Sequence, residues 1–147
     1  ILTSLNKNGL INENYILASL RQIFTNVRLK NLVEIRGADR TPEGFEIAPA
    51  AFWVGLLNVD SIRLKVLDEI SSWTINDRSL FNNASLCLDL NQMGPKSRTY
   101  GFWVRHFGEM SLEGLKTRSI EEYSLLKEFF DIIVSEGAFS LQVQKSG

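Results

Sequence analysis

Apolar positions recur at three- and four-residue spacing along most of the chain, which is the pattern of amphipathic helices. We predict helices over residues 13–26, 75–83 and 100–117, and a last helix between Ser119 and Gly137. Residues 50–70 form either one long helix or two abutting helices, opened by Pro49. Gly101 and Gly108 each weaken the 100–117 helix by about 1 kcal/mol relative to alanine.

Capping residues support several of these boundaries. Thr74 with Asp77, and Ser119 with Glu122, have the spacing of a capping box, in which side chains bond the first backbone N–H groups of a helix. Gly137 stands where a C-terminal cap is expected. Pro42 and Gly44 indicate a loop, and so do the residues between 86 and 97.

One segment, residues 31–38, has the composition of a β-strand that ends at Gly37. Side chains alternate along a strand, so Glu34 and Arg36 share one face with Leu32. A lone strand needs a hydrogen-bonding partner, either in a small hairpin with the neighbouring loop or in sequence not present here. The prediction is a mainly α fold with a short β element (an α+β fragment), in a single domain over residues 1–147.

Composition narrows the class of protein. The 147 residues are 44% hydrophobic and 22% charged with a net charge of -1, as in a globular domain without a nucleic-acid or membrane surface. No apolar run reaches the ~18 residues of a membrane span. A single cysteine, Cys87, allows no internal disulfide and is typical of a reducing compartment. We therefore expect a cytoplasmic location.

Glu34 and Arg36 are the candidate site residues. A carboxylate is a hard oxygen ligand for a divalent cation, and a guanidinium makes bidentate bonds to phosphate oxygens. An acid and an arginine on one rigid face therefore suit a metal ion bound to phosphate. The alternative is an ordinary surface ion pair, which is common and contributes little to stability.

Four other residues favour a structural role. His106 has no second histidine or cysteine at metal-ligand spacing, so we expect it to pack on an aromatic helix. Cys87 is flanked by leucines and is expected to be a small buried hydrophobe. Trp53 and Trp103 occupy apolar helical positions and are expected in the core or at an interface.

The stretch "VRLKNLVEIRGAD", followed by "APAAFWVGLL", closely resembles the glutamate–cysteine ligase family of the plant and proteobacterial type. Weaker similarity continues in "SSWTINDRSLF" and in "SLEGLKTRSIEEYSLLKEFFDIIVSEGA". The strand, loop and helix around Glu34 also look like the corresponding part of glutamine synthetase. The resemblance therefore implies the helical C-terminal part of a glutamine synthetase-like carboxylate-amine ligase.

The resemblance also implies a reaction. ATP phosphorylates the γ-carboxylate of glutamate, and the cysteine amine attacks the acyl phosphate to give γ-glutamylcysteine, the first step towards glutathione. By the same resemblance Glu34 is a ligand of Mg²⁺ and Arg36 contacts the transferred phosphate of ATP. Asp39 either lines the substrate site or orders the loop after the strand. The short basic cluster of Arg28 and Lys30 is expected to be solvated, and the alternative is a position near the nucleotide phosphates in the complete enzyme.

Two further expectations follow. Because the chain begins with Ile1, we expect it to be the C-terminal portion of a longer ligase, inactive without the N-terminal remainder. The loop over residues 40–46 is partly acidic where the family has a Gly-Pro-Trp-Arg-Arg type of loop, which bears on the choice of amino-acid substrates. The alternatives are a ligase with another amine or acid, and a helical interaction domain without catalysis.

Overall fold

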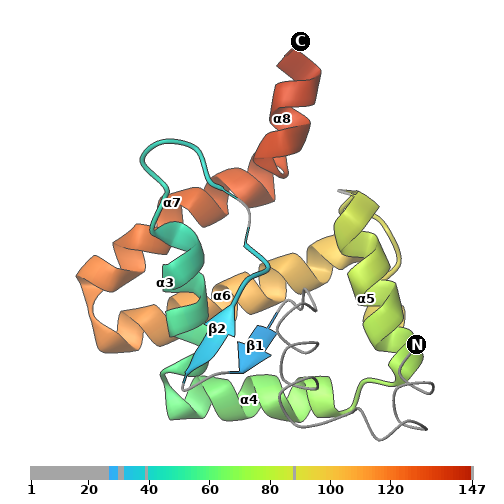
Figure 1. Cartoon of the computed structure of the whole chain (residues 1–147), viewed down its shortest axis with the longest axis horizontal. Coiled ribbons are helices and arrows are strands. Elements are labelled where there is room, and N and C mark those ends of the chain that lie inside the picture. Colours follow the sequence, from blue (N-terminus) through green and yellow to red (C-terminus); the bar gives the residue numbers. More distant parts are fainter. Residues whose placement is uncertain (1–26, 30–31, 39, 88, 147) are drawn as a thin grey trace, which may run out of the picture. The chain divides into compact units, whose positions relative to one another are not determined.

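The structure, a computed structural model, describes residues 27–29, 32–38, 40–87 and 89–146 (Figure 1). The helix predicted over residues 13–26 lies outside the described residues. The chain divides into two compact units, residues 1–39 and residues 40–147, and each is described here by itself. The expectation of a single domain over the whole chain stays a prediction.

The described part of the first unit is an antiparallel pair of strands, β1 (Val27–Leu29) and β2 (Val33–Ile35). In its register Arg28 lies opposite Glu34 and Val27 lies opposite Ile35. The predicted strand is thus confirmed in a shorter form. Its partner is the segment before it, which the sequence pattern did not predict as a strand.

The second unit is helical (Figure 1). Its elements are α3 (Ala48–Leu57), α4 (Asp60–Ser71), α5 (Ile75–Cys87), the 3-10 turn η1 (Pro95–Ser97), α6 (Tyr100–Arg118), α7 (Ile120–Glu136) and α8 (Phe139–Ser146). The mainly α fold with a short β element is confirmed, and the segment 50–70 forms two abutting helices. Helix α5 is longer than predicted, and α8 was not predicted. No helix in the described part of the chain is both long enough and apolar enough to cross a membrane.

The two predicted caps differ in completeness. At α5 the cap is reciprocal: Asp77 N donates to Thr74 Oγ1 at 3.1 Å, and Thr74 N donates to Asp77 Oδ2 at 2.9 Å. At α7 only one half forms, because Glu122 N donates to Ser119 Oγ at 3.0 Å while the Glu122 carboxylate pairs with Arg118. Both helices nevertheless begin where the caps predicted.

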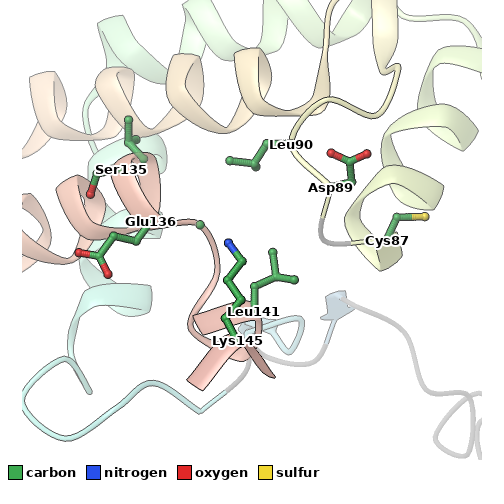
Figure 2. Close-up of a pocket in the computed structure, with 9 residues that line it drawn as sticks. Cys87, Asp89, Leu90, Ser135, Glu136, Leu141 and Lys145 are labelled. Carbon is green, nitrogen blue, oxygen red and sulfur yellow. The ribbon is translucent and has the colours of Figure 1, made fainter. Parts of the chain in front are cut away.

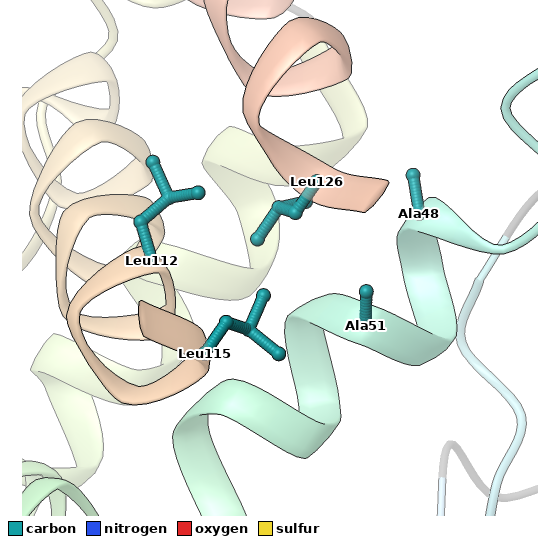
Figure 3. Close-up of a cluster of buried hydrophobic side chains, with 5 residues drawn as sticks. All are labelled: Ala48, Ala51, Leu112, Leu115 and Leu126. Atoms are coloured by element: carbon teal, nitrogen blue, oxygen red, sulfur yellow. The ribbon is translucent and has the colours of Figure 1, made fainter. Parts of the chain in front are cut away.

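Helices α3, α6 and α7 enclose the main hydrophobic core. Its buried members come from all three helices and are drawn in Figure 3: Ala48, Ala51, Leu112, Leu115 and Leu126. A second buried cluster joins α3, α4 and α6 through Leu56, Ile62 and Met110. Helices α3 and α6 contribute to both clusters, and together they join the two halves of the core.

Two glycines bring α3 and α6 into backbone contact. A Cβ atom on Gly114 would lie 2.1 Å from the carbonyl oxygen of Gly55, and one on Gly55 would lie 2.3 Å from the carbonyl oxygen of Ser111. Ser111 is fully buried, and its hydroxyl donates to the carbonyl oxygen of Phe52 at 2.8 Å. Small residues are needed here because neither backbone can move away without opening the core.

An aromatic cluster joins the connection between α4 and α5 to helices α5 and α6. Trp73 contacts Phe81, Trp103 and Phe107, with ring centroids 5.3, 4.9 and 6.1 Å away. Trp103 Nε1 donates to the carbonyl oxygen of Pro95 at 3.0 Å. Trp73 Nε1 is buried and has no hydrogen-bond partner among the residues that the structure describes.

We predict that Gly114→Ala destabilises the protein by about 1–3 kcal/mol, because the new methyl group meets the backbone of α3. Alanine would otherwise stabilise the helix by about 1 kcal/mol. The apparent melting temperature of the full protein, with hydrogen exchange of the α3 and α6 amides, measures the effect. Lys116→Ala on the exposed face of α6 is the matched control and should change little. A stabilised Gly114→Ala protein would contradict the close contact.

We also predict an acid-dependent contribution from Asp77. Hydrogen bonds from Lys96 N, Thr74 Oγ1 and Thr74 N lower the pKa of Asp77 from 3.8 to about 2. A carboxyl with a lowered pKa in the folded state stabilises it above pH 3.8, and the contribution is lost as the pH falls towards 2. The difference in melting temperature between the wild type and Asp77→Asn should therefore shrink over this range. A difference that is independent of pH would contradict the prediction.

Candidate functional site

The candidate site lies on the β1–β2 pair, where Glu34 faces Arg28 across the strands. Arg28 contacts one oxygen of the Glu34 carboxylate twice: Nε lies 2.7 Å and Nη2 lies 2.6 Å from Oε2. The side chains of Arg28 and Glu34 are 27% and 36% exposed. Glu34 is therefore held by a short, charge-assisted contact at a partly exposed position.

Arg36 lies beside the same carboxylate. Its Nε is 4.0 Å from Glu34 Oε1, and its side chain is 22% exposed. Both residues are thus on one side of the pair, as the alternation predicted. A distance of 4.0 Å allows electrostatic attraction but is longer than a hydrogen bond. The Glu34–Arg36 ion pair, which was the alternative interpretation of these two residues, is also present in the structure. Arg28 contacts Glu34 at a shorter distance than Arg36 does.

The Arg28 and Arg36 guanidinium groups both lie beside the Glu34 carboxylate. A guanidinium group suits an anion such as a phosphate. As for a metal, the described residues include no group of three His, Cys, Asp or Glu side chains that could hold one. Glu34 fits the part of one oxygen ligand, and the described residues do not fit a complete Mg²⁺ site.

Arg28 was expected to be solvated, with a position near the nucleotide phosphates as the alternative, and its contact with Glu34 was not predicted. The signal in the sequence is a basic residue six positions before Glu34, a spacing that pairing of the two strands brings together. Lys30 and Asp39 lie outside the described residues, so the proposed role of Asp39 stays a prediction. The predicted roles of Glu34 as a ligand of Mg²⁺ and of Arg36 as a contact to phosphate likewise stay predictions.

The loop before α3 is fixed to the helical unit by an aromatic contact. Its turn is closed by a hydrogen bond from Phe45 N to the carbonyl oxygen of Pro42 at 3.1 Å, with Gly44 at φ +90°. The Phe45 ring packs on Phe129 of α7 and Phe139 of α8, with centroids 5.6 and 5.9 Å away. The loop that departs from the family pattern therefore has a defined conformation.

The two tryptophans and the histidine that were considered as candidates pack against other side chains. Trp103 is buried and Trp53 is half-buried against the second cluster, as predicted. His106 stacks on Phe102 with centroids 5.7 Å apart and places Nε2 2.6 Å from Glu69 Oε2. Its predicted packing on an aromatic helix is thus confirmed.

The prediction for Cys87 is wrong, because the residue is exposed. It ends α5, where its flanking leucines do not enclose it, and its Sγ donates to the carbonyl oxygen of Asn83 at 3.4 Å. Cys87 lies at the edge of an open hollow of about 380 Å³, which is also lined by Asp89, Glu136 and Lys145 (Figure 2). In Figure 2 its sulfur points away from Lys145.

Comparison with known proteins establishes the family. Residues 5–99 match the family described as Glutamate-cysteine ligase family 2 (GCS2). That segment includes Glu34, Arg36 and helices α3 to α5. The chain therefore belongs to the glutamate-cysteine ligase family 2, as the sequence resemblance indicated.

Curated relatives agree with this assignment. The chain is 32% identical over 118 residues to the chloroplastic glutamate–cysteine ligase of Medicago truncatula and 34% identical over 119 residues to that of Nicotiana tabacum. It is 34% identical over 122 residues to glutamate–cysteine ligase A of Oryza sativa subsp. indica. These matches cover 78–80% of this chain and only 22–24% of the relatives. The chain thus spans about a quarter of the length of these relatives.

We predict that Phe45→Ala loosens the loop before α3 and destabilises the helical unit by about 2 kcal/mol, less than the ~3–5 kcal/mol of a fully buried phenylalanine. Hydrogen exchange at the amides of Phe45 and Ala48, which bond within the loop, measures the loosening. Ile47→Ala is the control, since Ile47 is 57% exposed in the same segment. Equal protection in Phe45→Ala and the wild type would contradict the anchoring role.

Proposed function

We propose that the protein containing this chain is an ATP- and Mg²⁺-dependent carboxylate-amine ligase that joins glutamate to cysteine. The product would be γ-glutamylcysteine, formed through γ-glutamyl phosphate on the route to glutathione. The observation that carries the proposal is the family match over residues 5–99, which includes Glu34 and Arg36. The names of the plant relatives support the same pair of substrates.

The geometry supports a role for this chain's residues in phosphoryl transfer. Phosphoryl transfer is catalysed mainly by positioning and by charge placed where charge develops. In the proposal the Arg36 guanidinium contacts the phosphate of ATP that is transferred to glutamate. Its neighbour Glu34 supplies one oxygen ligand to Mg²⁺. The bound Mg²⁺ would neutralise phosphate charge and orient the phosphate groups.

The remaining parts of the site are proposed to come from the rest of the enzyme. A single carboxylate does not complete a Mg²⁺ site, and the chain spans only 22–24% of its relatives. We therefore propose that the N-terminal remainder is the partner of this chain and that the chain is inactive without it. Asp39 is retained as a proposed contact to the substrate.

Two other predictions from the sequence carry over unchanged. The expected cytoplasmic location stays a prediction, and the plant relatives are named as chloroplastic proteins. Because the loop before α3 carries acidic side chains, a ligase that joins another amine or acid is retained as the alternative proposal. Glu46 accepts from Gly44 N at 3.1 Å and so belongs to the fixed part of that loop.

We predict that Arg36→Ala lowers kcat of the full-length protein by about 10²-fold or more, because a cation that stabilises the transferred phosphate is lost. The assay measures phosphate released from ATP with Mg²⁺, glutamate and cysteine. Release should require both amino acids. Arg105→Ala, which removes an exposed arginine of α6, is the matched control and should keep wild-type activity.

The possible failures have different meanings. A folded protein that binds ATP but releases no phosphate with glutamate and cysteine would favour another amine or acid. A folded protein that binds no nucleotide would favour a non-catalytic interaction domain. Full activity in Arg36→Ala would remove Arg36 from the proposed site.

A further inference from the structure

We infer that Phe139, the first residue of α8, is a positioning residue for the loop over residues 40–46. Through this loop the C-terminal helix acts on the binding of the amino-acid substrates. The inference rests on the function proposed above, and it gives α8 a part in that function. Its basis is an aromatic contact between α8 and the loop, together with the place of the loop in the chain.

The loop follows the proposed site residues closely along the chain. Arg40 comes four residues after Arg36 and directly after Asp39, the proposed contact to the substrate. An extended chain spans at most about 3.6 Å per residue, so the Cα atoms of Arg36 and Arg40 are separated by no more than about 14 Å. A displacement of the loop is therefore passed through the chain to the residues that are proposed to bind substrate.

Hydrogen bonds within the segment give the loop its shape. Phe45 N donates to the carbonyl oxygen of Pro42 at 3.1 Å, and Ala48 N donates to the carbonyl oxygen of Phe45 at 3.0 Å. Gly44, at φ +90°, donates its N–H to the Glu46 carboxylate at 3.1 Å. Because these bonds join residues of the segment to one another, they shape the loop but do not set its position on the helices.

Three aromatic rings set that position. Phe45 of the loop, Phe129 of α7 and Phe139 of α8 contact one another pairwise. The centroid of Phe139 lies 5.9 Å from that of Phe45 and 5.6 Å from that of Phe129. Phe45 also packs against the main core. The Phe139 ring therefore supports the Phe45 ring on its α8 side, both directly and through Phe129.

The connection between α7 and α8 fixes where the Phe139 ring lies. It consists of Gly137, at φ +85°, and Ala138. The carbonyl oxygen of Ala138 accepts from Leu141 N at 2.9 Å and from Gln142 N at 3.2 Å. The side chain of Gln142 donates from Nε2 to the carbonyl oxygen of Gly137 at 2.9 Å. The first turn of α8 is thus bonded to the end of α7, and it presents its aromatic ring to the loop.

A role of Phe139 in stability alone is separated by a matched control. Phe81 of α5 is also a half-buried phenylalanine in an aromatic cluster, with its ring centroid 5.3 Å from Trp73 and 5.4 Å from Tyr100. Replacement of either phenylalanine by alanine should lower the apparent melting temperature. Only the change at Phe139 should alter the loop and the binding of substrate.

Hydrogen exchange in the full-length protein tests the structural step. Phe139→Ala should raise the exchange rates of the Phe45 and Ala48 amides by about 10-fold, because the loop loses one of its supports. Phe139→Leu keeps an apolar side chain beside Phe45 and should recover part of the protection. Phe81→Ala should leave both amides within about twofold of the wild type.

Steady-state kinetics test the functional step, with ATP, Mg²⁺, glutamate and cysteine. Phe139→Ala should lower kcat/KM for one or both amino acids by about 10-fold, because ordering the loop becomes a cost of substrate binding. KM for ATP should stay within about twofold. Phe139→Leu should recover part of the loss, and Phe81→Ala should keep the wild-type constants. The Phe45→Ala/Phe139→Ala double variant should lose less than the product of the single losses, since the two rings are in contact.

The outcomes that would overturn the inference differ from failure of the proposed function. Unchanged exchange of the Phe45 and Ala48 amides in Phe139→Ala would mean that α8 does not hold the loop. Faster exchange with kcat/KM equal to that of Phe81→Ala would mean that the loop does not serve substrate binding. In both cases an inactive Arg36→Ala leaves the proposed function standing. A wild type without ligase activity, or a fully active Arg36→Ala, would remove the proposed function and the inference with it.

Discussion

The helical unit depends on the direct backbone contact between α3 and α6. Gly55 and Gly114 leave no room for a side chain, and the buried hydroxyl of Ser111 bonds the α3 backbone at the same crossing. Helix α3 is placed so close to α6 that it can contribute to both buried clusters. Its first residues follow the loop that Phe45 fixes to α7 and α8, so the crossing also sets where that loop can lie. One close contact thereby determines the geometry from the loop to the core.

Local signals predicted most of the helical boundaries, because caps and breakers act through the adjacent backbone. Thr74, Ser119 and Gly137 each stand at the helix end that the sequence indicated. Features that are short or that depend on residues distant in the sequence were not predicted. Helix α8 is short and follows Gly137, so its eight residues gave too few apolar repeats to recognise. The expected cost of Gly108 in α6 ignored the Phe130 ring, whose atoms would lie 2.0 Å from a Cβ there.

The candidate site was predictable in part. Alternation along a strand is a local rule, and it placed Glu34 and Arg36 on one face. The pairing with Arg28 depends on the register between β1 and β2, which a single strand pattern does not contain. The wrong expectation for Cys87 has a related cause, since flanking leucines indicate burial only if the helix end is covered. A prediction made from one segment thus succeeded where the structural feature depends on that segment alone, and failed where it depends on contacts with other segments.

The aromatic cluster has a spectroscopic consequence. Trp73 and Trp103, two of the three tryptophans, have ring centroids 4.9 Å apart. Indoles at this separation exchange excitation energy and interact electronically, so their absorption and near-ultraviolet circular dichroism carry a coupled signal. Trp53 contributes separately, beside Phe52 in α3. The protein therefore contains its own optical reporter of the contact between α6 and the connection from α4 to α5, without any added label.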